Sequence, residues 1–124
     1  MAGKKDQKDE EREDRIEMEI VVDAYDAGER AMGWYYYLEE NISPFTAVCT
    51  GKRAISPLKK GDQVEVSGMA PDDECQHEMF VTIRQGKGEL AVPLAQLKPE
   101  GDADKATRQA VEDWLYWVKQ GYEF

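Results

Sequence analysis

The sequence predicts an α+β fold in which a small, bent antiparallel sheet is flanked by an N-terminal and a C-terminal helix. Three observations support this prediction: a long stretch of helical periodicity, a central series of short alternating segments, and a second helical stripe near the C-terminus. Because the chain has only 124 residues and shows no internal repeat, we expect one α+β domain over 12–124. A charged, flexible lead over 1–11 is expected to precede it.

The N-terminal helix is expected over Arg12–Asn41. From Ile16 onward, apolar residues recur at steps of three and four, which is the spacing of one face of an α-helix. A break is expected near Asp26–Gly28, and Ser43-Pro44 ends the pattern because the residue before a proline disfavours helical backbone angles. The alternation within 16–22 also fits a short strand, and this alternative stays open.

Four central segments have the composition and alternation of short strands: Phe45–Thr50, Gln63–Gly68, Met79–Arg84 and Glu89–Val92. Lys59–Asp62 is a turn before the second segment, and the glycine-containing turn Gln85–Gly88 joins the last two as a hairpin. Strands of this length and spacing predict a strongly bent sheet or a small SH3-like barrel. Pro93–Leu97 suggests one helical turn after the hairpin.

The C-terminal helix is expected to begin after Asp102 or Asp104, since either side chain can cap it. Four residues at helical spacing form its predicted buried face: Ala106, Ala110, Trp114 and Trp117. Gly121 is expected to end this helix.

The charge balance narrows the classes of partner. With 26 acidic residues against 16 Lys and Arg, the formal net charge is −10. Such a chain repels the phosphates of nucleic acids and of anionic membranes, and it attracts cations and basic protein surfaces. No apolar stretch is long enough for a membrane span, and the N-terminus lacks the apolar segment of a signal peptide. We therefore expect a cytoplasmic monomer, with Cys49 and Cys75 as reduced thiols.

The first group of candidate metal ligands lies on the N-terminal helix. Glu39 and Glu40 are near its expected C-terminus, where the helix dipole disfavours carboxylates and favours a cation. Asp26 shares a helical face with Glu40, at three- and four-residue steps. A solvated acidic face is the alternative explanation of these residues.

The second group of candidate ligands is a loop. Asp72, Asp73 and Glu74 follow Pro71, which stiffens the approach to them. If the fold brings this loop to the end of the first helix, enough carboxylate oxygens converge for Ca²⁺, which takes about 6–8 oxygen ligands. The spacing is not that of an EF-hand, and an ordinary acidic surface turn is the alternative.

Other chemistries have weaker support in the sequence. A zinc site would have to use Cys75, His77 and Cys49, but structural zinc usually takes four ligands in CxxC-like pairs. No phosphate-binding loop and no arrangement of nucleophile and base is visible, so we expect no enzymatic activity. The alternative function is an SH3-like interaction module that binds a basic or proline-rich partner.

Five blocks of the sequence carry a resemblance to a known family: GWYYYLEE (33–40), SPLKKGDQVEV (56–66), MAPDDECQHEMFV (69–81), VPLAQL (92–97) and EDWLYWVKQGYEF (112–124). Together they resemble the CcbP-type calcium-binding proteins of cyanobacteria and other bacteria. The resemblance implies a small, acidic, cytoplasmic protein that binds calcium through surface carboxylates. It also implies that the protein buffers or sequesters calcium, or has a regulatory role that depends on calcium. It also implies that the acids at positions 39–40 and 72–74 are the calcium ligands.

Overall fold

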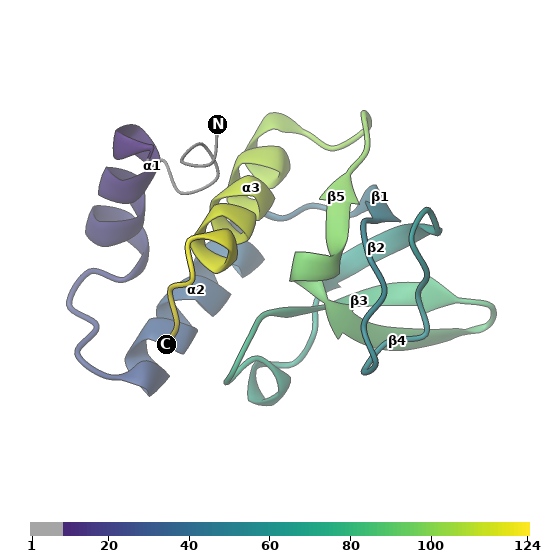
Figure 1. Ribbon diagram of the computed structural model, residues 1–124, viewed down its shortest axis with the longest axis horizontal. Helices are drawn as coiled ribbons and strands as arrows, with labels where there is room; N and C mark the ends of the chain where they lie inside the picture. The colour runs from purple at the N-terminus through teal and green to yellow at the C-terminus, as the bar shows by residue number, and fades with distance from the viewer. Residues whose placement is uncertain (1–8) are drawn as a thin grey trace.

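The computed structural model describes residues 9–124. It confirms the α+β class, with a five-stranded antiparallel sheet and α-helices packed beside it (Figure 1). The described α-helices are α1 (Glu10–Arg15), α2 (Ala27–Asn41) and α3 (Lys105–Lys119). The strands are β1 (Phe45–Cys49), β2 (Gln63–Met69), β3 (Phe80–Gln85), β4 (Gly88–Pro93) and β5 (Leu97–Pro99). Helices α2 and α3 contact each other and the sheet, whereas α1 lies on their outer side.

The sheet has the order β4-β3-β2-β1-β5, with β4 and β5 at its edges. The four predicted strands are all present, and β3 and β4 form the predicted hairpin, with Gln85 opposite Gly88. Strand β5 was not predicted, because three residues are too few to show an alternating pattern. It pairs with β1, where Leu97 lies opposite Cys49. The helical turn before it is the 3₁₀-helix η4 (Leu94–Gln96).

The N-terminal helical region differs from the single helix that the periodicity predicts. Of the predicted lead, residues 1–8 lie outside the described part of the chain, and α1 already begins at Glu10. Ile16–Ile20 forms a π-helix, η2, so the alternative of a strand over 16–22 is wrong. The four-residue step from Ile16 to Ile20 places both side chains in the core. The helical spacing was therefore the informative pattern in this segment.

The break in this region lies over 21–26, just before the position that the sequence predicts. Asp26 does not interrupt a helix but caps α2, since its Oδ1 accepts a hydrogen bond from the Glu29 N–H at 2.8 Å. Glu29 in turn accepts a hydrogen bond from the Tyr25 N–H at 2.8 Å. The two acids together satisfy main-chain donors at the start of α2.

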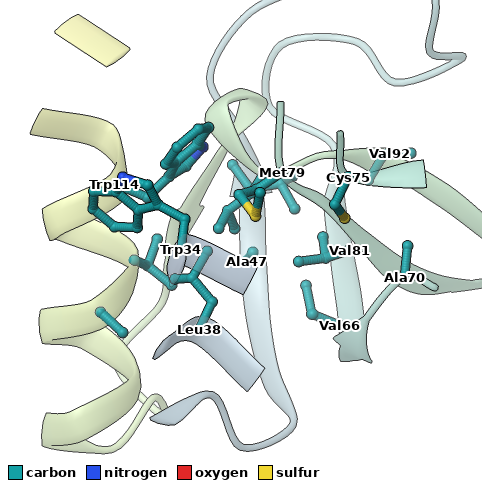
Figure 2. Packing of buried hydrophobic residues seen from close by; sticks show 14 of the residues in the cluster. Trp34, Leu38, Ala47, Val66, Ala70, Cys75, Met79, Val81, Val92 and Trp114 are labelled. Atoms are coloured by element: carbon teal, nitrogen blue, oxygen red, sulfur yellow. The ribbon is translucent and has the colours of Figure 1, made fainter. Parts of the chain in front are cut away.

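The core lies between α2, α3 and one face of the sheet (Figure 2). Trp34 and Leu38 of α2 are fully buried, and the Trp34 ring packs edge-to-face on Trp114 with centroids 5.1 Å apart. The sheet contributes aliphatic side chains: Ala47, Val66, Val81 and Val92. Burial of one such large apolar side chain is worth about 1.5–3 kcal/mol. Of the aromatic run of α2, Trp34 and Tyr35 are buried in the core, whereas Tyr36 is exposed.

The beginning of α3 shows which of the two predicted caps is used. Asp104 accepts a hydrogen bond from the Thr107 N–H at 2.7 Å, whereas Asp102 binds the side chain of Thr46. The predicted buried face holds for Ala110, Trp114 and Trp117, but Ala106 is exposed. Thr107 is buried in its place, because its hydroxyl accepts the Ser43 N–H and donates to the Asn41 carbonyl.

Asp113 of α3 joins the three helices through one carboxylate that the sequence did not single out as structural. Its side chain is fully buried and accepts hydrogen bonds from Arg12 and from Arg15, at 2.7–2.9 Å. Tyr37 of α2 donates a further hydrogen bond to it at 2.6 Å. Burial raises the pKa of Tyr37 to about 12, and the hydrogen bond to Asp113 adds to the rise. Four hydrogen bonds from three side chains thus compensate one buried charge.

Gly33 marks the close approach of α2 to η2. A Cβ atom at this position would lie 2.3 Å from the main-chain oxygen of Ile20. A side chain is therefore excluded unless the two segments separate. No helix within residues 9–124 combines the length and the apolar character that a membrane crossing requires.

Replacement of Asp113 by Asn should lower the free energy of unfolding by about 3 kcal/mol, because two arginines lose the charge that compensates them. The matched control is Glu112→Gln, whose side chain is 47% exposed and lies 4.0 Å from Arg12. This control should change the free energy by less than about 0.5 kcal/mol. Urea denaturation measures both, and equal effects of the two substitutions would contradict the role of Asp113.

Gly33→Ala should destabilise the protein by about 2 kcal/mol, because the added methyl group meets main-chain atoms rather than a flexible side chain. Gly28→Ala is the control on the same helix, since its Cβ would have only an ordinary contact at 3.5 Å. Alanine is the better helix former, so this control should be neutral or more stable by up to about 1 kcal/mol. Melting curves of both variants test the difference in sign.

Candidate metal site

The predicted acidic loop, Asp72–Glu74, is anchored at both ends by buried residues. Asp72–Glu74 forms a short 3₁₀-helix, η3, between β2 and β3, closed by a hydrogen bond of 3.0 Å from the Cys75 N–H to the Asp72 carbonyl. Ala70 before it and Cys75 after it are both buried. The three acids between these anchors are all exposed. The loop therefore presents its carboxylates to solvent from a fixed position.

One hydrogen bond brings this loop to α2. The Tyr35 hydroxyl donates to the Ala70 carbonyl at 2.9 Å, and this contact is buried. Glu39 follows Tyr35 by one helical turn, and Asp72 follows Ala70 by two residues. Burial raises the pKa of Tyr35, and the negative charges of Glu39 and Asp72 both add to the rise. The two predicted groups of acids therefore lie near one another, around the Tyr35 side chain.

The carboxylates of this region are not used by the rest of the fold. Five exposed acids have side-chain carboxylates with no hydrogen bond or ion pair to any residue in 9–124: Glu39, Glu40, Asp72, Asp73 and Glu74. The C-terminus of α2 adds the partial negative charge of its free carbonyl groups. The acids and the helix end together form a locally negative surface without a compensating cation from the described residues.

The oxygen atoms available at the end of α2 and in η3 are of the chemical type that binds calcium. The side chains, however, are not arranged as a finished calcium site. Carboxylate and carbonyl oxygens are the hard ligands that Ca²⁺ prefers. Within residues 9–124, however, no three side chains of His, Cys, Asp or Glu already converge on one point. An ion would therefore require the exposed carboxylates to turn toward it. Main-chain carbonyls and waters would complete its shell.

Asp26 is separated from the other predicted ligands. It caps the N-terminus of α2, whereas Glu39 and Glu40 lie at the opposite end of the same helix. Thirteen residues at 1.5 Å each put about 20 Å between these ends. Its carboxylate is also occupied by the cap hydrogen bond. The structure therefore does not bring Asp26 to the same site.

The residues of the zinc alternative do not come together. Cys49 and Cys75 are free and buried, and His77 is exposed. Burial raises the pKa of the Cys75 thiol, and the neighbouring acids of η3 add to the rise. The neutral thiol instead accepts a hydrogen bond from the Phe80 N–H at 3.3 Å. Cys75 therefore packs as a small core residue.

The sequence analysis missed the residue that joins the two acidic groups. Tyr35 is buried in the core, where it anchors α2, and its hydroxyl also holds the loop. The available signal was weak: a buried tyrosine normally finds a hydrogen-bond partner, and Ala70 precedes the acidic loop. Glu78, which follows that loop, is held by Arg53 in a two-point ion pair with both contacts at 2.8 Å.

These features define a small α+β protein whose exposed carboxylate cluster suits a divalent cation. The family model Calci_bind_CcbP, described as "Calcium binding", matches residues 14–118. The chain belongs to this family, the CcbP calcium-binding proteins. The crystal structure of CcbP from Anabaena is similar, with 44% sequence identity and a TM-score of 0.83 over 95% of this chain and 97% of that one.

A second solved structure is of a calcium-binding protein in the calcium-binding form. It is also 44% identical, with a TM-score of 0.83 over 94% of this chain and 96% of that one. The comparison with curated proteins gives no match. The two solved structures and the family model therefore agree on the same family.

Tyr35→Phe should lower the free energy of unfolding by about 1 kcal/mol, because the buried Ala70 carbonyl loses its donor. The neighbouring Tyr36→Phe is the control, since this side chain is 58% exposed and its hydroxyl forms no hydrogen bond with a described residue. Chemical denaturation compares the two, and amide hydrogen exchange at Cys75 should accelerate only in Tyr35→Phe. Unchanged exchange would show that the hydroxyl does not hold the loop.

Proposed function

We propose that this protein binds Ca²⁺ between the C-terminal end of α2 and η3, through the acids at positions 39–40 and 72–74. The observation that carries the proposal is the hydrogen bond from Tyr35 to Ala70, which joins α2 to the chain just before η3. Membership of a calcium-binding family supports the choice of ion. A relative that is 44% identical has been solved in a calcium-binding form, which supports it further.

The energetic basis of binding is relief of repulsion among neighbouring carboxylates. Neighbouring exposed acids at 39–40 and at 72–74 repel one another, and a divalent cation compensates part of that charge. Because the ligands are exposed and must turn toward the ion, we expect affinity on the order of 10⁻⁷–10⁻⁵ M or weaker. Added salt should weaken binding, since it screens exposed charges.

We propose a calcium-buffering or regulatory role in the cytoplasm, carried out by a monomer. An exposed site of moderate affinity releases its ion readily, which suits reversible storage or regulation. The two free, buried thiols are compatible with a reducing compartment. For the alternative of an SH3-like peptide-binding sheet, the supporting evidence is weaker. The exposed tyrosines, Tyr25 and Tyr36, lie outside the sheet.

The test is calorimetric titration of calcium at near-physiological salt, with magnesium as competitor. Glu39→Gln with Glu40→Gln, and separately Asp72→Asn with Asp73→Asn, should each weaken calcium binding at least about tenfold, which is about 1.4 kcal/mol. Thermal stability without calcium should be equal or slightly higher in both double variants, because repulsion between like charges is reduced.

Asp26→Asn is the matched control for these variants. It removes one acid from the same helix but keeps the cap, because Asn caps a helix about as well as Asp. Its calcium affinity should equal that of the wild-type protein. The proposal fails if the wild-type protein shows neither heat nor a shift in melting temperature at millimolar calcium, since a ligand of the native state must stabilise it.

A further inference from the structure

A groove of about 810 Å³ lies between the start of α2, the end of α3 and the loop that follows η3. Its size falls within the range of about 300–1,000 Å³ that ligand sites occupy. Its apolar lining comes from α2, α3 and the C-terminal residues: Ala31, Met32, Trp114, Trp117, Val118 and Tyr122. None of the five acids assigned to the calcium site lines it, so the groove is a separate feature of the molecule.

The groove results from small residues on one face of α2. Ala27, Gly28 and Ala31 leave space beside the helix that larger side chains would fill. Arg30 donates from Nε to the main-chain oxygen of Phe124 at 2.7 Å and so holds the C-terminal residues beside α2. Val118 is 40% exposed on the groove wall. A concave, mostly apolar groove of this size is the usual form of a binding site.

The charge around the groove favours a cationic partner. Arg53 is the arginine of the lining, and Glu78 neutralises it with two contacts of 2.8 Å. Glu123 adds a negative charge to the rim. The net charge of the whole chain, −10, adds attraction for a cation at longer range.

The acidic loop continues directly into the groove wall. Glu74 precedes Gln76, a lining residue, by two positions, so at most about 7 Å of chain separates them. This separation is shorter than the Debye length of about 10 Å at 0.1 M salt. The charge of η3 therefore acts on whatever occupies the groove. A calcium ion bound at η3 would reduce that charge.

We propose that this groove docks a basic amphipathic helix of a partner protein, and that calcium bound at η3 weakens the docking. The apolar face of the partner helix, with residues at i, i+3, i+4 and i+7, packs on Met32, Trp117 and Val118. Its Lys and Arg residues face Glu123 and the acids of η3. Linkage requires that the partner lowers calcium affinity by the same factor. The second half of the proposal rests on the proposed calcium function, and the first half does not.

The probe is a labelled peptide of about five helical turns, built from Leu and Lys with amphipathic spacing, and its binding is followed by fluorescence anisotropy in a chelator. Saturable binding that weakens with added salt is expected. A peptide with Glu at every Lys position has the same apolar face and should not bind. Equal binding of the two peptides would overturn the assignment of a basic partner.

Two substitutions that add the same charge locate the site. Val118→Glu places a carboxylate in the groove and should weaken peptide binding at least tenfold. Val22→Glu is the control, because Val22 is 48% exposed and does not line the groove, and it should leave binding unchanged. Both positions are exposed, so both variants should keep the fold, which melting curves check. Equal effects of the two substitutions overturn docking in the groove.

Other occupants of the groove give different outcomes. A second copy of the chain would appear as self-association in analytical ultracentrifugation, abolished by Val118→Glu, and this result would overturn the proposal. Binding of the wild-type protein to anionic phosphatidylserine vesicles, lost in Val118→Glu, with no binding of the basic peptide, would indicate a lipid surface and would also overturn it.

The calcium dependence is measured with the same peptide. Saturating calcium should weaken peptide binding several-fold, whereas magnesium at equal ionic strength should have a smaller effect. If calorimetry shows calcium binding but the peptide affinity does not change, the coupling is wrong. If calcium does not bind at all, the calcium function and the coupling both fail, while the measurement in chelator still decides whether the groove docks the helix.

Discussion

The buried carboxylate of Asp113 is the interaction on which the helical part of the molecule depends. It lies on α3 and is bound by two arginines from the segment around α1 and by Tyr37 of α2. Removal of the charges of Asp113, Arg12 and Arg15 from water costs free energy, and only the complete set of hydrogen bonds to Asp113 compensates that cost. The network therefore defines one relative placement of the three helices. Since α2 carries Tyr35 and the acids at its end, the position of the proposed calcium site depends on this network as well.

Two groups of acids have different roles in the molecule. Asp26, Asp104 and Asp113 are bound to main-chain or side-chain donors and stabilise particular elements of the fold. The acids at 39–40 and 72–74 have no such partner among residues 9–124 and face solvent. The repulsion among these acids lowers the stability of the fold only slightly, because water screens exposed charges. The same negative charge attracts a divalent ion.

Much of the fold could be predicted from the sequence, because periodicity and turn chemistry are local signals. The β3–β4 hairpin and the buried face of α2 are the clearest cases. The π-helix η2 could not be predicted, because the four-residue step between its buried residues, Ile16 and Ile20, fits an α-helix equally well. The short strand β5 could not be predicted, because three residues carry no period. The two acidic groups were identified, but their proximity was not, because it depends on one long-range hydrogen bond.

The close contact between Gly33 and the Ile20 carbonyl has a consequence for how the protein responds to an ion. With no side chain between them, the two segments meet through main-chain atoms, and a rotation of α2 that brought a Cβ atom to this place would collide with the Ile20 carbonyl. The helix thus acts as a rigid support rather than as a lever. We therefore expect that an ion bound at the end of α2 changes the conformation of the segment between Ala70 and Met79, while the helices keep their positions.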